Sequence, residues 1–255
     1  MPLIFDTHAH YDDGRFDEDR AGLLASLPEH GVGLVVNPGC DMETSRKALA
    51  IAEAYPHVYA AVGYHPENCA PYKPEDIGVL RGLARRPKAV AIGEIGLDYH
   101  WEELCPRQRQ KEVFLAQLEL AKRHDMPVVI HDREAHGDMM DILRATRPKG
   151  VVHCFSGSVE LARETVKLGL YIGLGGVVTF KNARHSLEVA QDIPLDRLLT
   201  ETDAPYMSPV PFRGKRCDSS LIPYAAEKIA EVRGITAGEV LAAGVENAKR
   251  LFGIQ

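Results

Sequence analysis

Short apolar runs alternate with longer amphipathic segments along most of this chain. The apolar runs are rich in Val, Ile and Leu and lack polar alternation, which is typical of strands buried on both faces of a parallel sheet. Eight such strands are predicted, over residues 3–7, 34–37, 58–63, 89–95, 128–131, 150–153, 170–174 and 198–202.

The segments between these runs have helical periodicity, and stop signals follow two of them at Pro127 and Gly169. Eight strands separated by helices predict an α/β fold, a (β/α)₈ TIM barrel. The alternative is an open doubly wound sheet, which usually carries G-x-G-x-x-G after its first strand. Here the first strand runs into His8-Ala9-His10 instead. The helices are predicted over residues 19–29, 42–54, 107–124, 135–146, 159–168, 221–232 and 237–252.

Length and composition agree with a single barrel. The chain has 255 residues, of which 45% are hydrophobic and 26% charged, as in an ordinary globular protein. No linker or low-complexity tract divides it, so we expect one domain over residues 1–255. The start lacks the features of a signal peptide and no stretch is apolar enough to span a bilayer, so we expect a cytoplasmic protein without membrane contact. No obligatory protein partner is evident.

The five cysteines are widely spaced and form no C-x-x-C motif. This pattern predicts free thiols in a reducing compartment, without a disulfide framework or a thiolate zinc site. The formal net charge of −6 argues against a protein that simply coats nucleic acid. It does not exclude an enzyme with a local phosphate site, because bound cations supply positive charge where it is needed.

Histidines and acidic residues end or directly follow six of the predicted strands. Active sites of this barrel gather at the carboxyl ends of the strands, so these side chains should face one mouth. The residues are His8 and His10 after the first strand, His65 after the third, Glu94 in the fourth, His131 in the fifth, His153 in the sixth, and Glu201 and Asp203 in the eighth.

Imidazole and carboxylate groups bind Zn²⁺, Mn²⁺ or Fe²⁺ well, and carboxylates also suit Mg²⁺. Each residue also has a structural interpretation: a lone histidine is often only hydrogen-bonded, Glu94 could pair with a basic residue, and Asp203 could cap a turn. The repetition at so many strand ends favours a metal site. We predict that one or two divalent ions are held by His8, His10, Glu94, His131, His153 and Asp203.

Several longer motifs go beyond this pattern. They are FDTHAHYDDGRFDEDR, VGYHPE, AIGEIGLDY, PVVIHDREAHGDMMDIL, HCFSGS, YIGLGGVVTFKNA and LLTETDAPYMSPVPFRGKR. Through them almost the whole chain resembles the TatD family of metal-dependent deoxyribonucleases, within the amidohydrolase-like barrels. The D-x-H-x-H element alone is shared by many amidohydrolases, whereas HCFSG and ETDAPY together with GEIGLDY are much more specific.

The resemblance implies a metal-dependent phosphodiesterase, often a 3′→5′ exonuclease, with single-stranded DNA as its substrate. It implies that Glu94 bridges two ions and that His65 faces the scissile phosphate. Asp203 is the expected base, which takes a proton from water. Carried over by position, the resemblance places two sets of ligands that share Glu94. One ion would be held by His8, His10, Glu94 and Asp203, and the second by Glu94, His131 and His153.

Other residues near these positions are candidates for binding substrate. Arg133 could hold a phosphate or pair with Asp138. Arg213, Lys215 and Arg216 could form a phosphate-attracting rim or an ordinary solvated loop. Phe155 and Tyr206 could stack on a base or pack against the protein. Glu201 is placed with this set, and it could instead orient a metal ligand or be the base.

One motif departs from the family, which usually continues R-G-K-R with Asn-Glu-Pro. Here Arg216 is followed by Cys217-Asp218-Ser219. Because this loop follows Asp203, we expect it to border the mouth and to affect the choice of substrate. The departure motivates an alternative function, an amidohydrolase or esterase acting for example on mischarged aminoacyl-tRNA. A metal-dependent binding protein without catalysis is a third interpretation.

Overall fold

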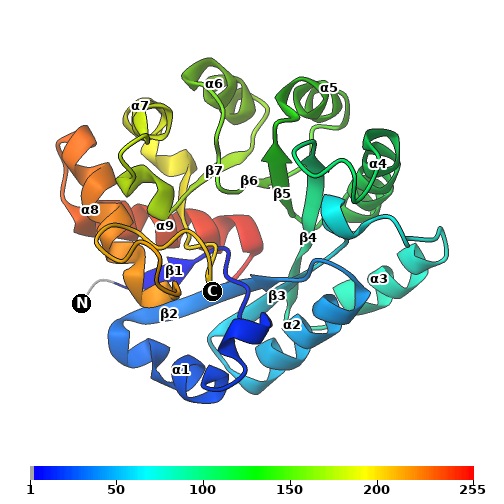
Figure 1. The fold of residues 1–255 in the computed structure, drawn as a ribbon, viewed down its shortest axis with the longest axis horizontal. Coiled ribbons are helices and arrows are strands. Elements are labelled where there is room, and N and C mark those ends of the chain that lie inside the picture. Colours follow the sequence, from blue (N-terminus) through cyan, green and yellow to red (C-terminus); the bar gives the residue numbers. More distant parts are fainter. Residues whose placement is uncertain (1–2) are drawn as a thin grey trace.

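Eight parallel strands form one sheet in the order of the sequence, with each strand beside the next. Hydrogen bonds between the first and last strand regions complete the ring, from Thr7 N to Thr200 O at 3.1 Å and from Asp203 N to His8 O at 2.8 Å. The computed structural model describes residues 3–255 and confirms the predicted (β/α)₈ barrel (Figure 1). The strands are β1 (Ile4–Asp6), β2 (Val32–Pro38), β3 (Val58–Val62), β4 (Ala89–Asp98), β5 (Val128–Arg133), β6 (Gly150–Val152), β7 (Tyr171–Leu174) and β8 (Leu198–Thr200).

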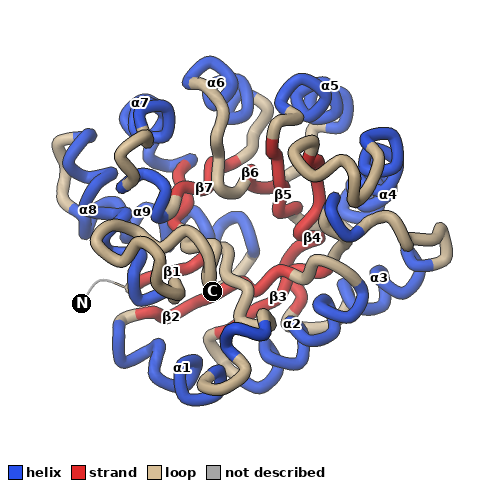
Figure 2. The backbone as a smooth tube through the Cα atoms, in the orientation of Figure 1, coloured by secondary structure: helices blue, strands red, loops and turns tan. Residues whose placement is uncertain are grey.

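The α-helices surround the strands on the outside of the barrel (Figure 2). Every predicted helix is present, although the first is shorter than predicted and continues as a 3₁₀ helix over Leu27–His30. Helices α3 and α7 add to those predicted. The α-helices are α1 (Arg20–Ser26), α2 (Met42–Ala54), α3 (Asp76–Ala84), α4 (Arg107–Arg123), α5 (His136–Thr146), α6 (Val159–Lys167), α7 (Arg184–Asp192), α8 (Ile222–Arg233) and α9 (Ala237–Phe252).

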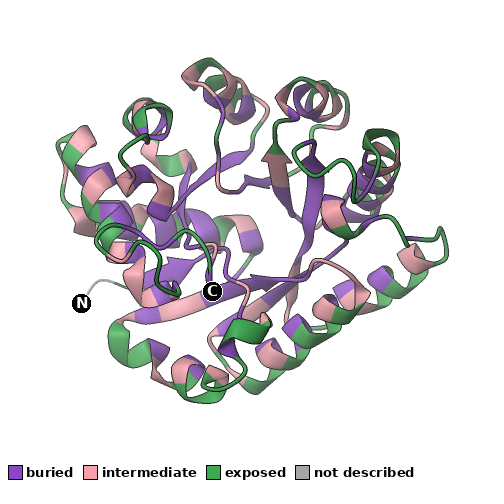
Figure 3. Cartoon of the chain, in the orientation of Figure 1, coloured by how far each residue is buried: buried purple, intermediate pink, exposed green. Residues whose placement is uncertain are grey.

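A packed layer of apolar side chains fills the barrel interior, with one residue from each strand: Phe5, Val36, Ala61, Ala91, Val129, Val151, Tyr171 and Leu199. Phe252 of α9 packs against it, with its ring centroid 6.0 Å from that of Phe5. Val129 and Val151 precede His131 and His153 by two residues, so each pair lies on the same face of its strand. The apolar layer therefore forms a floor beneath the histidines, and Figure 3 shows the strands buried inside the ring of helices.

Two of the five cysteines are paired, which corrects the prediction of free thiols. Cys69 and Cys105 form a disulfide, whereas Cys40, Cys154 and Cys217 are free. Cys69 follows β3 and Cys105 lies in the loop after β4, so neighbouring parallel strands bring both to the same rim of the barrel. Their separation of 36 positions in the sequence conceals this proximity.

No helix within residues 3–255 combines the length and apolar composition needed to cross a membrane.

A substitution at Gly96 of β4 tests whether the close approach of β4 and β5 requires a glycine. A Cβ at this position would lie 2.0 Å from the carbonyl oxygen of His131, and its φ of +148° is unfavourable for other residues. We expect Gly96→Ala to lower the free energy of unfolding by about 1–3 kcal/mol or more. Gly82→Ala is the control, because it lies in α3 with nothing within 4 Å of an added Cβ; it should stabilise by about 0.5–1 kcal/mol. Equal denaturation midpoints for the two variants would contradict this account of the β4–β5 contact.

Candidate metal centre

The five predicted histidines lie together with Glu94 and Asp203 at the carboxyl-terminal mouth of the barrel. The position of Glu94 within its strand is a correction: β4 does not end there but continues to Asp98. The pairing of β4 with β5 is irregular between Ile92 and Ile95. At this irregularity Glu94 N donates a hydrogen bond to the carbonyl oxygen of Gly39, which follows β2, at 2.8 Å. The Glu94 side chain is buried, with 3% of it exposed.

The two carboxylate oxygens of Glu94 face different groups of histidines. Oε2 lies 3.1 Å from His8 Nε2 and 3.5 Å from His10 Nε2. These two imidazole nitrogens are themselves 3.1 Å apart. The first group therefore comes from the loop that directly follows β1.

The second oxygen of Glu94 faces three other imidazoles. Oε1 lies 2.7 Å from His153 Nε2, 3.0 Å from His131 Nδ1 and 3.4 Å from His65 Nε2. The rings of His8 and His153 stack at a centroid distance of 3.8 Å, so the two groups meet there. One carboxylate thus contacts histidines that follow or end β1, β3, β5 and β6.

Asp203 completes the first group. Its Oδ1 lies 3.6 Å from His10 Nε2 and 3.8 Å from His8 Nε2. The backbone bond from Asp203 N to His8 O fixes this approach. The Asp203 side chain is 17% exposed, whereas that of Glu201, on the same strand end, is 1% exposed.

Burial and mutual contact shift the pKa values of the groups at this centre in both directions. Burial alone would raise the pKa of Glu94, but the neighbouring imidazoles of His153 and His8 hold it well below its usual range. Burial alone would lower the pKa of His131, but hydrogen bonds to Asp98 and Glu94 raise it to about 10. Burial raises the pKa of the Glu201 carboxyl to about 8.

The donor set fits a divalent metal, because imidazoles and carboxylates are its preferred ligands. Four sets of potential ligand atoms have all their members within 4.8 Å of one another: His8, Glu94 and His153; His8, His10 and Asp203; His10, Cys40 and Glu94; and His65, Glu94 and His131. Every histidine predicted for the site belongs to one of them. Several metal-ligating arrangements therefore share Glu94.

Asp98 is a part of the site that sequence reasoning missed. Its Oδ2 lies 2.9 Å from His131 Nε2, on the opposite side of the ring from the nitrogen that contacts Glu94. A carboxylate in this position fixes the tautomer and orientation of a metal-ligating histidine. The signal was present in GEIGLDY, but the predicted strand ended at residue 95, before Asp98.

Cys40 is the second missed residue. It follows β2, and its Sγ lies 3.9 Å from His10 Nδ1, while His10 Nε2 faces Glu94 and Asp203. Burial raises the pKa of the Cys40 thiol to about 11. No motif in the sequence pointed to this contact.

The loop that departs from the family packs against the segment that carries the first two histidines. Cys217 and Ser219 are fully buried. Ser219 Oγ donates to Asp6 Oδ2 at 2.6 Å and lies 2.7 Å from the hydroxyl of Tyr11. Asp6 Oδ1 in turn accepts a hydrogen bond from His8 N. The residues that differ from the family therefore contribute hydrogen bonds to the D-x-H-x-H segment.

Several side chains predicted to bind substrate are engaged by the protein. Phe155 lies in the hydrophobic core with 7% exposed, and Glu201 accepts a hydrogen bond from Cys154 N; in this conformation neither has a free face. Arg216 forms a bidentate salt bridge with the carboxylate of Asp19. The Arg213 guanidinium lies 3.7 Å from the centroid of the Phe180 ring.

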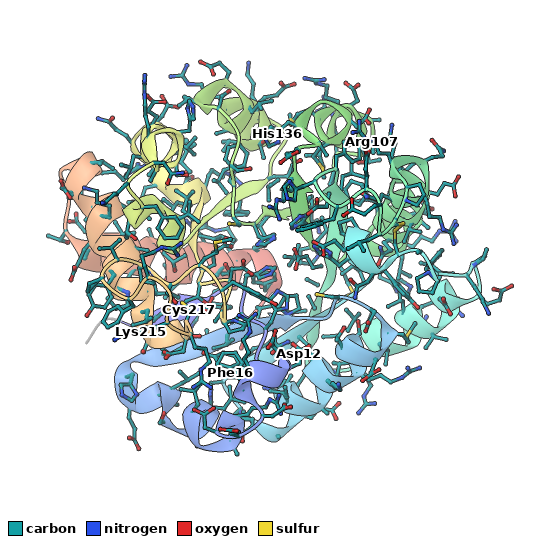
Figure 4. The ribbon with its side chains drawn as sticks, viewed as in Figure 1. Asp12, Phe16, Arg107, His136, Lys215 and Cys217 are labelled. Atoms are coloured by element: carbon teal, nitrogen blue, oxygen red, sulfur yellow. A yellow bond between two sulfur atoms is a disulfide. The ribbon has the colours of Figure 1, made fainter. Side chains whose placement is uncertain are left out.

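Tyr206 and Arg133 are both exposed. The guanidinium of Arg15 lies 3.9 Å from the centroid of the Tyr206 ring, so part of this ring is covered. The expected alternative for Arg133, an ion pair with Asp138, is wrong, because Asp138 pairs with Lys111 at 2.7 Å. Figure 4 labels Cys217, in the loop after β8, and Arg107, where α4 begins, on opposite sides of the barrel in this view.

The comparisons with known proteins agree with this geometry. A family model described as TatD related DNase matches residues 5–253. An uncharacterized metal-dependent hydrolase, YabD of Bacillus subtilis, is 44% identical over 99% of this chain and 100% of its own length. A protein of Erwinia tasmaniensis named 3′-5′ ssDNA/RNA exonuclease TatD is 35% identical over 98% of this chain and 100% of its own. The crystal structure of YjjV, a TatD homolog from Escherichia coli, superposes with a TM-score of 0.92 at 35% identity, covering 99% of this chain and 98% of that one.

Ser219→Ala tests the support beneath the centre. The variant removes a donor to the buried carboxylate of Asp6 and a partner of the Tyr11 hydroxyl, so we expect a loss of about 1–3 kcal/mol in the free energy of unfolding. Ser220→Ala is the matched control, because the Ser220 hydroxyl bonds only to Asp218 on the same loop; a change of about 0.5 kcal/mol or less is expected. Similar losses in both variants, measured by denaturant unfolding, would remove the special role of Ser219.

Proposed function

This chain belongs to the family of TatD-related DNases, which are metal-dependent hydrolases, and on that premise we propose that it is a phosphodiesterase acting on single-stranded nucleic acid. The exonuclease name carried by several relatives supports this substrate class. Within the chain, the main support is the arrangement of Glu94, whose two oxygens face separate histidine groups.

We assign the ligands as two sets that share Glu94. The first contains His8, His10 and Asp203, and the second contains His131 and His153. Divalent cations bound there would lower the pKa of water and offset negative charge on the phosphoryl oxygens. Mg²⁺, Mn²⁺, Zn²⁺ and Fe²⁺ all suit such donors, so the residues support two ions without selecting one element.

Side chains at the centre would carry out proton transfer and would orient the metal ligands and the substrate. Asp203 is the more exposed of the two carboxylates at the end of β8, and we assign it the proton taken from the attacking water. Asp98 holds the ring of His131 through a hydrogen bond, and the Glu201 carboxyl lies 3.9 Å from His153 Nδ1, where it supports that ring from behind. His65, whose Nδ1 accepts a hydrogen bond from Glu67 N, presents Nε2 to the centre beside the expected phosphate.

The esterase alternative rested on the loop after Arg216. Because Cys217 and Ser219 are fully buried, the residues that depart from the family offer no side chain that would favour a carbonyl substrate. Hydrolysis of an aminoacyl ester is therefore included in the substrate panel below only as the competing result.

A substrate panel tests the proposed function. The purified protein would be freed of metal with EDTA, supplied separately with Mg²⁺, Mn²⁺, Zn²⁺ or Fe²⁺, and given single-stranded DNA, duplex DNA, RNA and an aminoacyl ester. We expect single-stranded DNA or RNA to be shortened from the 3′ end with at least one metal. Glu94→Ala should abolish this with every metal, because both ligand sets lose their shared residue. Hydrolysis of the ester alone would overturn the phosphodiesterase proposal, and the absence of turnover in the whole panel would favour a binding protein.

Asp203→Asn and Glu201→Gln separate the base from its support. The asparagine keeps the size and one oxygen but loses the charge and the proton acceptor, so kcat should fall by about 10²–10⁴-fold or more with KM less affected. Glu201→Gln, which acts on the orientation of His153, should cost about 10–100-fold. Steady-state kinetics on one oligonucleotide would measure both. A larger loss in the Glu201 variant would mean that the two roles are assigned the wrong way round.

A further inference from the structure

The loop between β4 and α4 carries the single tryptophan of the chain. Trp101 is 40% exposed, and Leu104 in the same loop is 49% exposed. An indole left this open has a flat aromatic surface that a ligand can reach. The way in which this loop is held connects it to the site.

Asp98 holds both the tryptophan loop and the centre. Its Oδ1 accepts hydrogen bonds from His100 N at 2.9 Å and from Trp101 N at 3.1 Å, while Oδ2 contacts His131 Nε2 at 2.9 Å. The His100 ring packs edge to face against Trp101 at a centroid distance of 4.8 Å. Its Nδ1 lies 2.8 Å from Glu134 Oε1, which ties the loop to the end of β5. The indole is thus positioned at the edge of the centre.

Arg133 provides a positive charge beside this ring. Its guanidinium carbon lies 6.0 Å from the centroid of Trp101, and the residue is exposed. Within residues 3–255, the Arg133 side chain makes no ion pair with a carboxylate. By contrast, Arg15 beside Tyr206 on the opposite side of the mouth is paired with Asp13. Within the described residues, Arg133 is therefore a cation beside the indole whose charge no carboxylate neutralises.

We propose that Trp101 and Arg133 form a nucleotide subsite, in which the indole stacks on a base and the guanidinium binds an adjacent phosphate. An exposed aromatic ring with a nearby cation is the combination that binds single strands without sequence preference, because every base has a stacking face. A duplex keeps its bases stacked inside, so this subsite selects single-stranded substrates. The inference rests on the proposed function and specifies where the substrate lies.

The emission of Trp101 reports binding directly, since the chain has no other tryptophan. The protein in EDTA would be titrated with an oligothymidylate of about ten nucleotides, which is long enough to cover such a site, and with an abasic deoxyribose phosphate oligomer of the same length. We expect quenching by oligothymidylate and little quenching by the abasic oligomer. Equal quenching by both would show that the indole senses only the backbone, and would overturn stacking.

Kinetics provide an independent test in the presence of metal. Stacking contributes about 1–3 kcal/mol per base, so Trp101→Ala should raise KM for single-stranded DNA by about 5- to 150-fold with kcat nearly unchanged. Trp101→Phe should recover part of this loss. Leu104→Ala is the matched control, because it removes an equally exposed apolar side chain from the same loop without a stacking face. Arg133→Gln should reduce the slope of log KM against log salt by about one.

The outcomes separate this inference from the proposed function. If oligonucleotides are hydrolysed but Trp101→Ala and Leu104→Ala have the same KM, the subsite is absent and the phosphodiesterase remains. If no oligonucleotide is hydrolysed with any metal, the proposed function fails. A kcat loss in Trp101→Ala without a change in KM would place the residue in support of Asp98, and would also overturn the subsite.

Discussion

The structure depends on one buried carboxylate that must be surrounded by positive or donating groups. An ionised carboxylate moved away from water is destabilising unless other groups compensate it. Glu94 is 3% exposed and has five imidazoles within 3.5 Å. These come from segments up to 145 residues apart, between His8 and His153. A closed ring of parallel strands brings these strand ends to one mouth, so the barrel is what gathers the five imidazoles around one carboxylate.

This ring explains why much of the site was predictable. In a parallel barrel all the strands end at one mouth, so the positions of His8, His131 and His153 after apolar runs determined their location without knowledge of any contact. The sequence pattern did not predict those contacts that depend on the path of a loop or on where a strand ends. Asp98 was missed because β4 runs beyond the apolar pattern. The Cys69–Cys105 disulfide was missed because the path of two loops, not spacing, brings the sulfur atoms together.

The departing loop shows that a residue close in sequence to a ligand can have its side chain buried in the protein. Ser219 follows Asp203 by sixteen residues, yet its hydroxyl bonds to Asp6, two residues before His8. The loop also keeps Cys217 fully buried, and Cys217 N donates to Pro205 O at 3.1 Å. Its sequence is therefore constrained by the packing beneath His8. A change there alters how firmly the first histidine group is held, whatever the substrate is.

Asp98 links chemistry and recognition through its two oxygens. One orients His131 and the other holds the backbone of the loop that carries Trp101. The proposed nucleotide subsite and the candidate metal centre therefore share the side chain of Asp98, so a change of this residue should affect both.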